Sequence, residues 1–457
     1  MQKTPSQKQL DKFLELFKLK RYNEAEKIAV TFTEKFPKFS YSWKALGVVL
    51  KKQNKIEQSL KASQKAIEIN PNDAEAHFNV GNTFKELNRL KDSEISYKKA
   101  INLKSDYLEA YNNLGTVLRE LGRLEESEAS YKKAIEIKPD FADAYNNLSL
   151  TMLTKHNFNQ AFELSEWRWK SKIKIGDKLQ TKKPHWNGEK NSSILVWKEQ
   201  GIGDEIMYCS ILPELIEQSK KIILNCDKRL IPLFKRSFPN HIIYESEKKL
   251  INEDNYDYHI PMGSLPRFFR NNIKSFNKSS KGYLKAYKLK TLEFRKKLNI
   301  KKNNLIIGIS WHTKSIIQMA SFRNVILKDF VTKIFNSNIK FVNLQYGDVF
   351  EEIKDLKNET GIDIINFSEL NKKDDLDGIA SLVSACDVVI SIDNFILHLA
   401  GSLGIQTKAL LPFSSDARWG QKGKECYLYD SVHFYRQARL GYWESVLNQI
   451  KEDINQN

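Results

Sequence analysis

The first third of the chain repeats itself with a period of about 34 residues. Three successive units begin at Ser40, Ala74 and Leu108. Each unit has an aromatic residue or histidine, then an aliphatic–glycine pair, then an alanine: Trp43, His77 and Tyr111; Gly47, Gly81 and Gly115; Ala66, Ala100 and Ala134. A unit of this length is one helical hairpin, which cannot bury its apolar face alone, so hairpins must stack. The sequence therefore predicts an α-solenoid with a concave binding groove.

These repeated positions resemble the tetratricopeptide repeat. A weaker unit precedes them, with Ala25 and Pro37 in register, and a decaying unit follows, with Tyr145, Leu148 and Ala161 in place. Atypical end units are expected, because terminal repeats cap the stack. The resemblance implies a solenoid of four to five repeats over residues 1–175, whose role is to bind a protein or peptide.

Three asparagines, Asn79, Asn113 and Asn147, occupy the same position in the first helix of successive units. In the O-linked N-acetylglucosamine transferases, which these repeats resemble, an asparagine ladder at this position contacts a peptide backbone. The resemblance makes the three residues candidates for acceptor binding. The repeat consensus itself favours asparagine there, so a purely structural role is the alternative.

From residue 193 the sequence pattern changes, after a linker at 176–192 rich in Pro, Gly, Asn and Ser. Short apolar segments alternate with longer helical patterns, which predicts parallel sheets. The apolar segments are ILVW, KIILNC and YDYHIPM, then NLIIGISW, IKFVNLQYG, DIINF, DVVISID and TKALLPF. We expect two α/β domains, at 193–290 and 300–457, that enclose a cleft. The stretch from Ser431 is expected to form a closing helix that can cross back to the first sheet.

The segment Ile194 to Ile206 runs from an apolar strand through a turn with Gly201 and Gly203 into a helix that opens on Asp204. Ligands bind at the carboxyl ends of parallel strands, so Asp204 is a candidate catalytic carboxylate. The alternative is a helix N-cap beside a turn.

Several ordered motifs resemble glycosyltransferase family 9, the heptosyltransferase-like GT-B enzymes, and above all its tetratricopeptide-fused bacterial relatives. The motifs are EQGIGD, GISW, NLQYG, DVVISIDNFILHLAGSLG and LLPFSSDARW, with EWRW, PHWNG and FYRQ typical of the fused group. The resemblance implies a GT-B fold of two Rossmann-like α/β domains and an inverting, metal-independent glycosyltransferase. It assigns Asp204 as the base that deprotonates the acceptor hydroxyl. The donor would be a nucleotide-diphosphate sugar, with no metal and no other cofactor. The acceptor, recruited by the groove of the solenoid, would be a protein or peptide, or a surface glycan precursor.

The donor would lie against the second sheet. Asp393 and Asn394 begin a helix whose backbone N–H groups suit a diphosphate, and His398 can donate to a phosphate or ribose oxygen or be an ordinary buried histidine. Lys314 and Arg323 would supply positive charge, with Arg323 at a basic position of the family. Gln345 would contact the base or ribose. The remaining predicted donor residues are Gly201 and Gly203, which permit close approach of phosphate, sugar or acceptor.

The chain departs from the family pattern after Asp393. A small hydroxyl residue followed by Gly or Ala is usual there, whereas this chain has Asn394 and Phe395. A bulky Phe395 could crowd the phosphates. The rival to the enzyme is therefore a tetratricopeptide scaffold whose GT-B region has lost catalysis.

The net charge of +17 is spread over the chain, which is typical of a solvated lysine-rich surface and does not indicate nucleic acid. One stretch, Lys274 to Lys302, is densely basic. It is either a solvated linker or helix face, or an electrostatic guide for an anionic substrate or membrane surface.

The remaining signals are weak. The pair Asp375 and Asp377 matches the D-x-D of metal-dependent transferases, but its context predicts an acidic first helical turn. The four cysteines are scattered and are expected to be reduced and buried. No apolar run suggests a spanning helix and the N-terminus lacks a signal-peptide core, so a cytoplasmic location is expected.

Overall fold

The computed structural model describes residues 4–171, 176–238, 242–248, 251–276, 281–298, 304–313 and 323–456. The chain divides into two compact units. The first comprises Met1–Thr151 and Lys170–Lys172, and the second comprises Met152–Trp169 and Ile173–Asn457. No described helix is long and apolar enough to cross a membrane.

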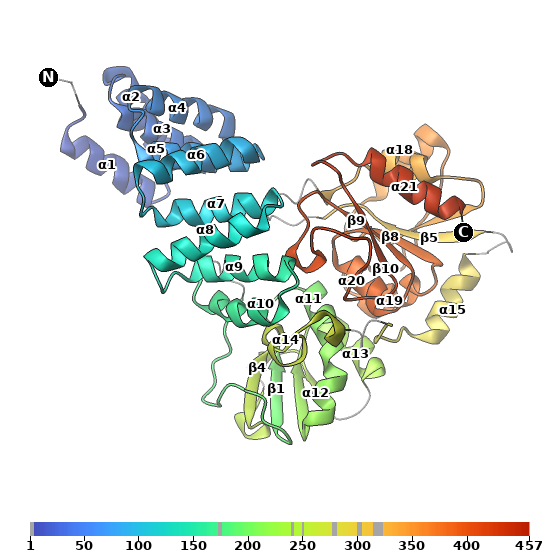
Figure 1. Ribbon diagram of the computed structural model, residues 1–457. Coiled ribbons are helices and arrows are strands. Elements are labelled where there is room, and N and C mark those ends of the chain that lie inside the picture. The colour runs from blue at the N-terminus through green and yellow to red at the C-terminus, as the bar shows by residue number, and fades with distance from the viewer. Residues whose placement is uncertain are drawn as a thin grey trace. The chain divides into compact units, whose positions relative to one another are not determined.

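The first unit is built of antiparallel helix pairs stacked one on the next (Figure 1). Its helices are α1 (Gln7–Lys18), α2 (Tyr22–Lys35), α3 (Ser40–Lys52), α4 (Ile56–Ile69), α5 (Ala74–Glu86), α6 (Leu90–Leu103), α7 (Leu108–Glu120), α8 (Leu124–Ile137) and α9 (Ala142–Thr154), the last of which runs into the second unit. The predicted solenoid of helical hairpins is confirmed.

Each of the three hairpins α3–α4, α5–α6 and α7–α8 is closed in the same way. The turn between its helices holds one residue in the left-handed region, where Gly and Asn are tolerated: Asn54, Asn88 and Gly122 in three successive hairpins. The consensus glycine lets the helices approach, since a Cβ on Gly115 would lie 2.7 Å from the ring of Tyr131. The carbonyl of Gly115 accepts a 2.7 Å hydrogen bond from Ser127 Oγ on the opposing helix. The repeat consensus is thus explained by close helix packing.

The second unit contains two sheets in which every pair of neighbouring strands is parallel. The first sheet has the order β3-β2-β1-β4, with β1 (Ser193–Trp197), β2 (Lys221–Asn225), β3 (Ile242–Glu245) and β4 (Tyr258–Pro261). The second has the order β10-β9-β8-β5-β6-β7, with β5 (Leu305–Ser310), β6 (Ile339–Asn343), β7 (Ile364–Ile365), β8 (Val388–Ile392), β9 (Thr407–Leu411) and β10 (Val432–Arg436). Both predicted sheets are present as α/β structures.

Helices follow the strands in both sheets (Figure 1). The α-helices of the second unit are α10 (Phe158–Ser165), α11 (Ile202–Tyr208), α12 (Leu212–Gln218), α13 (Ile231–Ser237), α14 (Pro266–Phe269), α15 (Lys288–Lys297), α17 (Leu327–Ile334), α18 (Phe350–Thr360), α19 (Leu376–Val383), α20 (Phe395–Ser402) and α21 (Glu444–Asn455). Short 3₁₀ helices include η1 (Glu166–Trp169), η2 (Cys209–Ile211), η3 (Lys228–Leu230), η5 (Glu253–Asn255), η6 (Met262–Ser264), η7 (Ile273–Phe276) and η8 (Ala417–Trp419).

The apolar strands are buried, as expected for parallel sheets with covered faces. Ile194, Val196, Ile222 and Leu224 are fully buried in one core with residues of α20 such as Leu399. The four cysteines are buried and unpaired, as expected.

Two features of the second unit differ from the expectation. Strands β3 and β10 were not predicted, and both lie at sheet edges. The stretch from Ser431 was expected to be one helix, but Val432–Arg436 forms β10 and only Glu444–Asn455 is helical. Helix α21 packs through Val446 and Ile450 on the core of the second sheet and not on the first sheet.

Candidate functional site

The strand order of the second sheet reverses between β5 and β8. From β5 the chain continues outward to β6 and β7, and from β8 it continues outward on the other side to β9 and β10. Open α/β sheets bind ligands in the crevice at such a switch point. Asn394 lies just beyond the end of β8, and its Nδ2 donates to Ser310 Oγ at the end of β5 over 2.8 Å. The predicted donor residues Asp393 and Asn394 therefore lie at the carboxyl ends of the strands, as expected.

The side chain of Asn394 caps α20, because its Oδ1 accepts a 2.9 Å bond from the N–H of Ile396. Asparagine and serine are about equally good in this role, and threonine is somewhat weaker. Asn394, in place of the hydroxyl residue usual in the glycosyltransferases that the sequence resembles, therefore preserves the cap.

Gln345 was expected to contact a base or ribose, but its side chain is fully buried. Its Oε1 accepts bonds from Ser310 Oγ at 3.0 Å, from the N–H of Trp311 at 2.9 Å and from the N–H of His312 at 3.0 Å. The amide holds the end of β5 in place and is shielded from any ligand.

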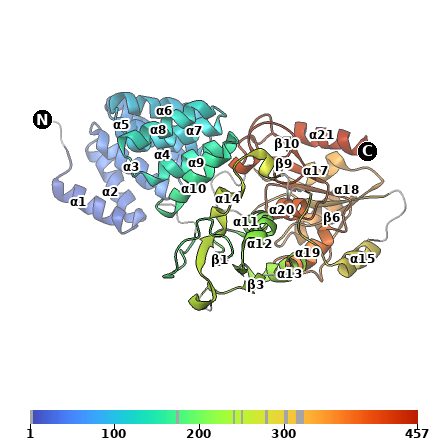
Figure 2. The ribbon, with the colours of Figure 1, turned by 60° about the horizontal axis from the view of Figure 1, so that its bottom comes forward.

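Helices α11 and α20, from the two sheets, are in direct contact, and both ribbon views show them side by side (Figures 1 and 2). A Cβ on Gly203 would lie 3.2 Å from His398 Cδ2 and 3.7 Å from Phe395 Cα. Gly203 thus faces α20, and this side of it has no room for a phosphate. Gly201 is the N-cap residue of α11.

Asp204 forms an ion pair and does not cap its helix. Its Oδ1 accepts a 2.7 Å bond from Arg418 in η8, and the N-cap position of α11 is held by Gly201 and not by Asp204. The helix-cap alternative is therefore wrong. Arg418 also donates from Nε to Asp416 Oδ1 over 3.0 Å. Arg418 and Asp416 belong to the quoted motif LLPFSSDARW, but neither was singled out as a site residue.

His398 is almost fully buried between aromatic rings. Its ring stacks on Trp419 at 4.9 Å between centroids, and its Nδ1 lies 2.9 Å from the hydroxyl of Tyr429. Its Nε2 lies 3.5 Å from Arg418 NH1. Burial lowers the pKa of His398 to about 3, so the imidazole is neutral at physiological pH. In this conformation both ring nitrogens face protein groups.

Asp393 and Arg323 pair across the end of the second sheet, with 3.3 Å between Arg323 NH1 and Asp393 Oδ2. Burial raises the pKa of Asp393, and Arg323 opposes this shift. Arg323 keeps about a fifth of its side chain exposed, at 21%. Lys314, the other predicted cation, lies outside the described residues.

A cavity of about 450 Å³, here called the inter-sheet cavity, lies beside Phe395. It is lined by apolar and aromatic side chains together with three cations: Ile202, Leu376, Tyr346 and Phe395, and Arg229, Lys372 and Lys373, with Gly347. The rings of Tyr346 and Phe395 lie 5.5 Å apart. Burial lowers the pKa of Lys372 to about 8, and its Nζ donates to Asn366 Oδ1 over 2.6 Å. No sequence motif pointed to these three cations.

A second cavity, of about 580 Å³, lies at the carboxyl ends of β1 and β2 and is here called the first-sheet cavity. It shares Ile202 and Arg229 with the inter-sheet cavity. Its wall includes Glu205, whose Oε2 accepts a 2.7 Å bond from the N–H of Asp227. Burial raises the pKa of Glu205 to about 7. A carboxyl group that titrates near neutrality can accept or donate a proton.

In the first unit, two of the three predicted asparagines, Asn113 and Asn147, belong to a chain of amide hydrogen bonds between successive hairpins. Asn113 Nδ2 donates to Asn82 Oδ1 over 2.8 Å, and Asn147 Nδ2 donates to Asn112 Oδ1 over 3.0 Å. These four side chains are half-buried, as is Asn79. The pattern of one asparagine per repeat identified Asn113 and Asn147 but missed their partners on the preceding helices.

Two weak signals of the sequence have structural explanations. Asp375 is the N-cap of α19 and accepts from the N–H of Gly378, and Asp377 pairs with Arg236, so the acidic helical turn is confirmed. In the basic stretch, Lys290 and Arg295 form ion pairs with Asp375 and Asp387, each at 2.7 Å. Part of the basic charge of α15 is therefore neutralised; residues 277–280 and 299–302 of this stretch are outside the described part.

Comparisons with known proteins identify the repeats of the first unit. Residues 47–88 and 115–155 match a model described as TPR repeat, and residues 74–107 match the tetratricopeptide repeat. The N-terminal hairpins are therefore tetratricopeptide repeats.

The chain is also similar to a curated relative and to several solved structures. Protein FlbA of Caulobacter vibrioides is 26% identical over 317 residues, which cover 65% of this chain and 52% of FlbA. The chain thus spans about half the length of that relative. The crystal structure of MamA is 20% identical and covers 34% of this chain and 91% of its own, with a TM-score of 0.32. That of TTC0263, a protein of Thermus thermophilus, is 18% identical and covers 35% and 87%, with a TM-score of 0.31.

The buried carboxyl of Glu205 predicts a pH dependence of stability. Its folded-state pKa of about 7 exceeds the ordinary value of 4.5, so folding takes up a proton between these pH values. The contribution of Glu205 to the unfolding free energy is therefore complete below pH 4.5 and is lost as the pH rises through 7. The slope is at most about 1.4 kcal/mol per pH unit.

Replacing Glu205 with Gln should flatten this slope in chemical denaturation curves measured from about pH 5 to about pH 8. The exposed Glu217→Gln is the matched control and should keep the wild-type slope. Equal slopes in wild type and Glu205→Gln would show that Glu205 is ionised throughout.

Proposed function

We propose that the chain is an inverting, metal-independent glycosyltransferase with a GT-B fold, formed by Rossmann-like domains at 193–290 and 300–457. The sugar comes from a nucleotide-diphosphate donor and passes to an acceptor recruited by the tetratricopeptide repeats. One observation carries the proposal: a cavity with aromatic and cationic walls adjoins the start of α11, where Asp204 lies.

The inter-sheet cavity has the chemistry that a nucleoside diphosphate requires. Lys372, Lys373 and Arg229 can neutralise the phosphates, and Tyr346 and Phe395 offer ring faces to a base. Phe395 lines the cavity and does not replace the capping residue, which is Asn394. The cations compensate the charge of the departing diphosphate, which is the task of a metal ion in metal-dependent transferases.

Asp204 is the proposed base for the acceptor hydroxyl. Inversion at the anomeric carbon needs one base and no enzyme nucleophile, so a single carboxylate suffices. Arg418 holds one oxygen of Asp204 at 2.7 Å and fixes its orientation. Glu205 is the second candidate, because its carboxyl lines the first-sheet cavity and titrates near neutrality.

The repeats recruit the acceptor, proposed to be a polypeptide bound along the amide chain of Asn113 and Asn147. Half-buried amides retain polar atoms at the surface that a peptide backbone can bond. The nucleotide sugar and this polypeptide are the two proposed partners.

A scaffold without catalysis is the second candidate function. This function is favoured because two predicted donor residues already interact within the protein. Gln345 is fully buried, and both ring nitrogens of His398 face protein groups. Nucleotide binding separates the two functions, because a donor site binds a nucleoside diphosphate and a degenerate one does not.

Asp204→Asn tests the proposed base. With a panel of nucleotide sugars and the released nucleoside diphosphate as the readout, turnover should fall by about 100-fold to 10,000-fold, because the amide cannot accept the proton. Glu205→Gln is measured in parallel. Unchanged turnover in Asp204→Asn with loss in Glu205→Gln would transfer the role to Glu205, and release in neither wild type nor variants would favour the scaffold.

Lys372→Gln tests the donor cavity. The nucleoside diphosphate that most raises the melting temperature of the wild type should bind this variant about 10-fold more weakly, since one charge-assisted bond is lost. Lys340→Gln, on the exposed face of β6, is the control and should bind as the wild type does. Equal thermal shifts in all three proteins would place the nucleotide elsewhere.

Asn113→Ala and Asn147→Ala test acceptor recruitment. Each should raise the KM for a polypeptide acceptor about 3-fold to 10-fold, the effect of one hydrogen bond, without changing the KM for the donor. Asn146→Ala, also on α9 but outside the bonds described above, is the control. A KM for the acceptor that stays at the wild-type value in all variants, with folding intact, would limit the amides to a structural role.

A further inference from the structure

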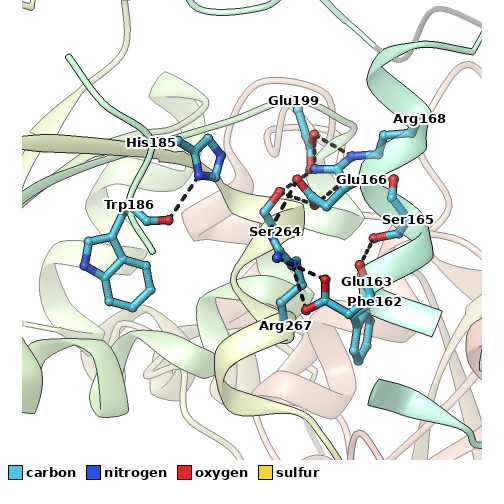
Figure 3. A network of polar contacts seen from close by, with 10 residues as sticks. All are labelled: Phe162, Glu163, Ser165, Glu166, Arg168, His185, Trp186, Glu199, Ser264 and Arg267. Atoms are coloured by element: carbon cyan, nitrogen blue, oxygen red, sulfur yellow. Dashed lines mark hydrogen bonds and ion pairs between the residues drawn. The ribbon is translucent and has the colours of Figure 1, made fainter. Parts of the chain in front are cut away.

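The first sheet also has a switch point, between β1 and β4. The loop after β1 carries Glu199, and the segment after β4 carries Gly263 and Ser264 in η6. In an open α/β sheet this crevice is where a ligand is expected. Here it is filled from outside the sheet by the side chain of Arg168, which comes from η1 in the EWRW motif (Figure 3).

Arg168 uses its whole guanidinium group in this crevice. Nε and NH2 form a fork on the carboxylate of Glu199: Nε donates to Oε2 over 3.1 Å, and NH2 donates to Oε1 over 3.1 Å and lies 2.9 Å from Oε2. NH2 also donates to Ser264 Oγ over 2.8 Å. NH1 donates to Glu166 Oε1 over 2.7 Å and to the carbonyl of Ser165 over 3.1 Å. One side chain thus joins η1 to the ends of both β1 and β4.

The surrounding residues are shaped to fit this pair. Ser264 Oγ donates to Glu166 Oε1 over 2.6 Å, which closes the network. A Cβ on Gly263 would lie 1.9 Å from Glu199 Oε1, so only glycine leaves room for the carboxylate. The side chains of Arg168 and Glu199 are 6% and 1% exposed, so the ion pair is almost completely shielded from solvent.

Stability alone does not explain such a pair. Removing two charges from water costs several kcal/mol per ion, and apolar replacements of buried pairs are often neutral or stabilising. Burial raises the pKa of Glu199, although Arg168 opposes the shift, so desolvation is costly here. What the fork supplies is a fixed position, because two parallel bonds define the orientation of both groups.

The position that is fixed is that of the loop leading to the proposed base. Glu199 lies two residues before Gly201, the N-cap of α11, and Asp204 follows in the first turn. The loop from Lys198 to Ile202 also lines the first-sheet cavity. A shift of Glu199 would therefore displace both the cavity wall and the start of α11.

We propose that Arg168 is a positioning residue, which holds the loop from Lys198 to Gly201 so that Asp204 keeps its place in the reaction. This role rests on the proposed function, and it assigns to the EWRW motif a task in catalysis that it performs through Glu199.

The test compares four variants of the full chain. Arg168→Lys keeps the charge but loses the fork, and Arg168→Met and Glu199→Gln each break the pair. The double variant Arg168→Met with Glu199→Gln removes both charges, so that no ion is left buried alone. The matched control is Arg270→Lys, because Arg270 is 1% exposed and forms a similar fork on Glu214, which belongs to α12 and not to the loop.

The measurements are the melting temperature, kcat, the KM values for donor and acceptor, and the backbone amide hydrogen exchange of residues 198–206. Arg168→Lys should lower kcat about 10-fold to 100-fold with little change in the donor KM, since a misplacement of about 1 Å costs on that order. Exchange in the loop should accelerate. The double variant should regain much of the melting temperature lost by the single variants while kcat stays low.

Arg270→Lys should lower the melting temperature without changing kcat or the exchange of the loop. If kcat recovers together with the melting temperature in the double variant, Arg168 is structural only and the proposal is overturned. If wild type shows no turnover, the proposed function fails by itself, and hydrogen exchange alone decides: equal loop exchange in Arg168→Lys and Arg270→Lys overturns the positioning role.

Discussion

The direct contact between α11 and α20 is the constraint on which the second unit depends. It exists because residue 203 is a glycine, whose missing side chain admits His398 and Phe395 to the surface of α11. Arg418 forms a 2.7 Å ion pair with Asp204 of α11 and lies 3.5 Å from His398 of α20, so it stabilises the same contact. The two sheets are thus in contact at the turn of the EQGIGD motif. Ile202, beside this contact, lines both the inter-sheet cavity and the first-sheet cavity.

The two sheets treat their switch points differently. In the second sheet a neutral amide, Asn394, bridges the strands by a bond to Ser310, and the cations lie nearby in the inter-sheet cavity. In the first sheet a buried guanidinium, Arg168, occupies the crevice and is fully bonded. Because Arg168 fills this crevice, a ligand of the first sheet would have to bind in the first-sheet cavity. The EWRW motif is explained by this occupation, and Trp169 adds to it by packing on Trp197 at 5.4 Å.

Local patterns in the sequence predicted most of the helices and strands but not the contacts between side chains that are distant in the sequence. The period of the repeat predicts the hairpins, because the contact of Gly115 with Ser127 recurs between Gly47 and Ser59 and between Gly81 and Ser93. The central strands were predicted from their apolar runs, and so were the edge strands β4 and β7. Strand β3 was missed because it is short and only partly buried, and β10 was missed because polar residues such as His433 interrupt its apolar pattern. Asp204 and Arg418 are 214 residues apart, and no pattern in one sequence relates them. Gln345 shows the converse: a polar residue at a strand end suggested a ligand contact, but three neighbouring donors satisfy it.

A nucleotide-diphosphate sugar is proposed to bind between the two sheets. A structure of the full chain with the nucleoside diphosphate that most stabilises it is the strongest test of this proposal. We expect phosphate oxygens within hydrogen-bond distance of Lys372 or Arg229, and a base against Tyr346 or Phe395. A nucleotide bound outside the inter-sheet cavity, or no bound nucleotide with any member of the panel, would contradict it.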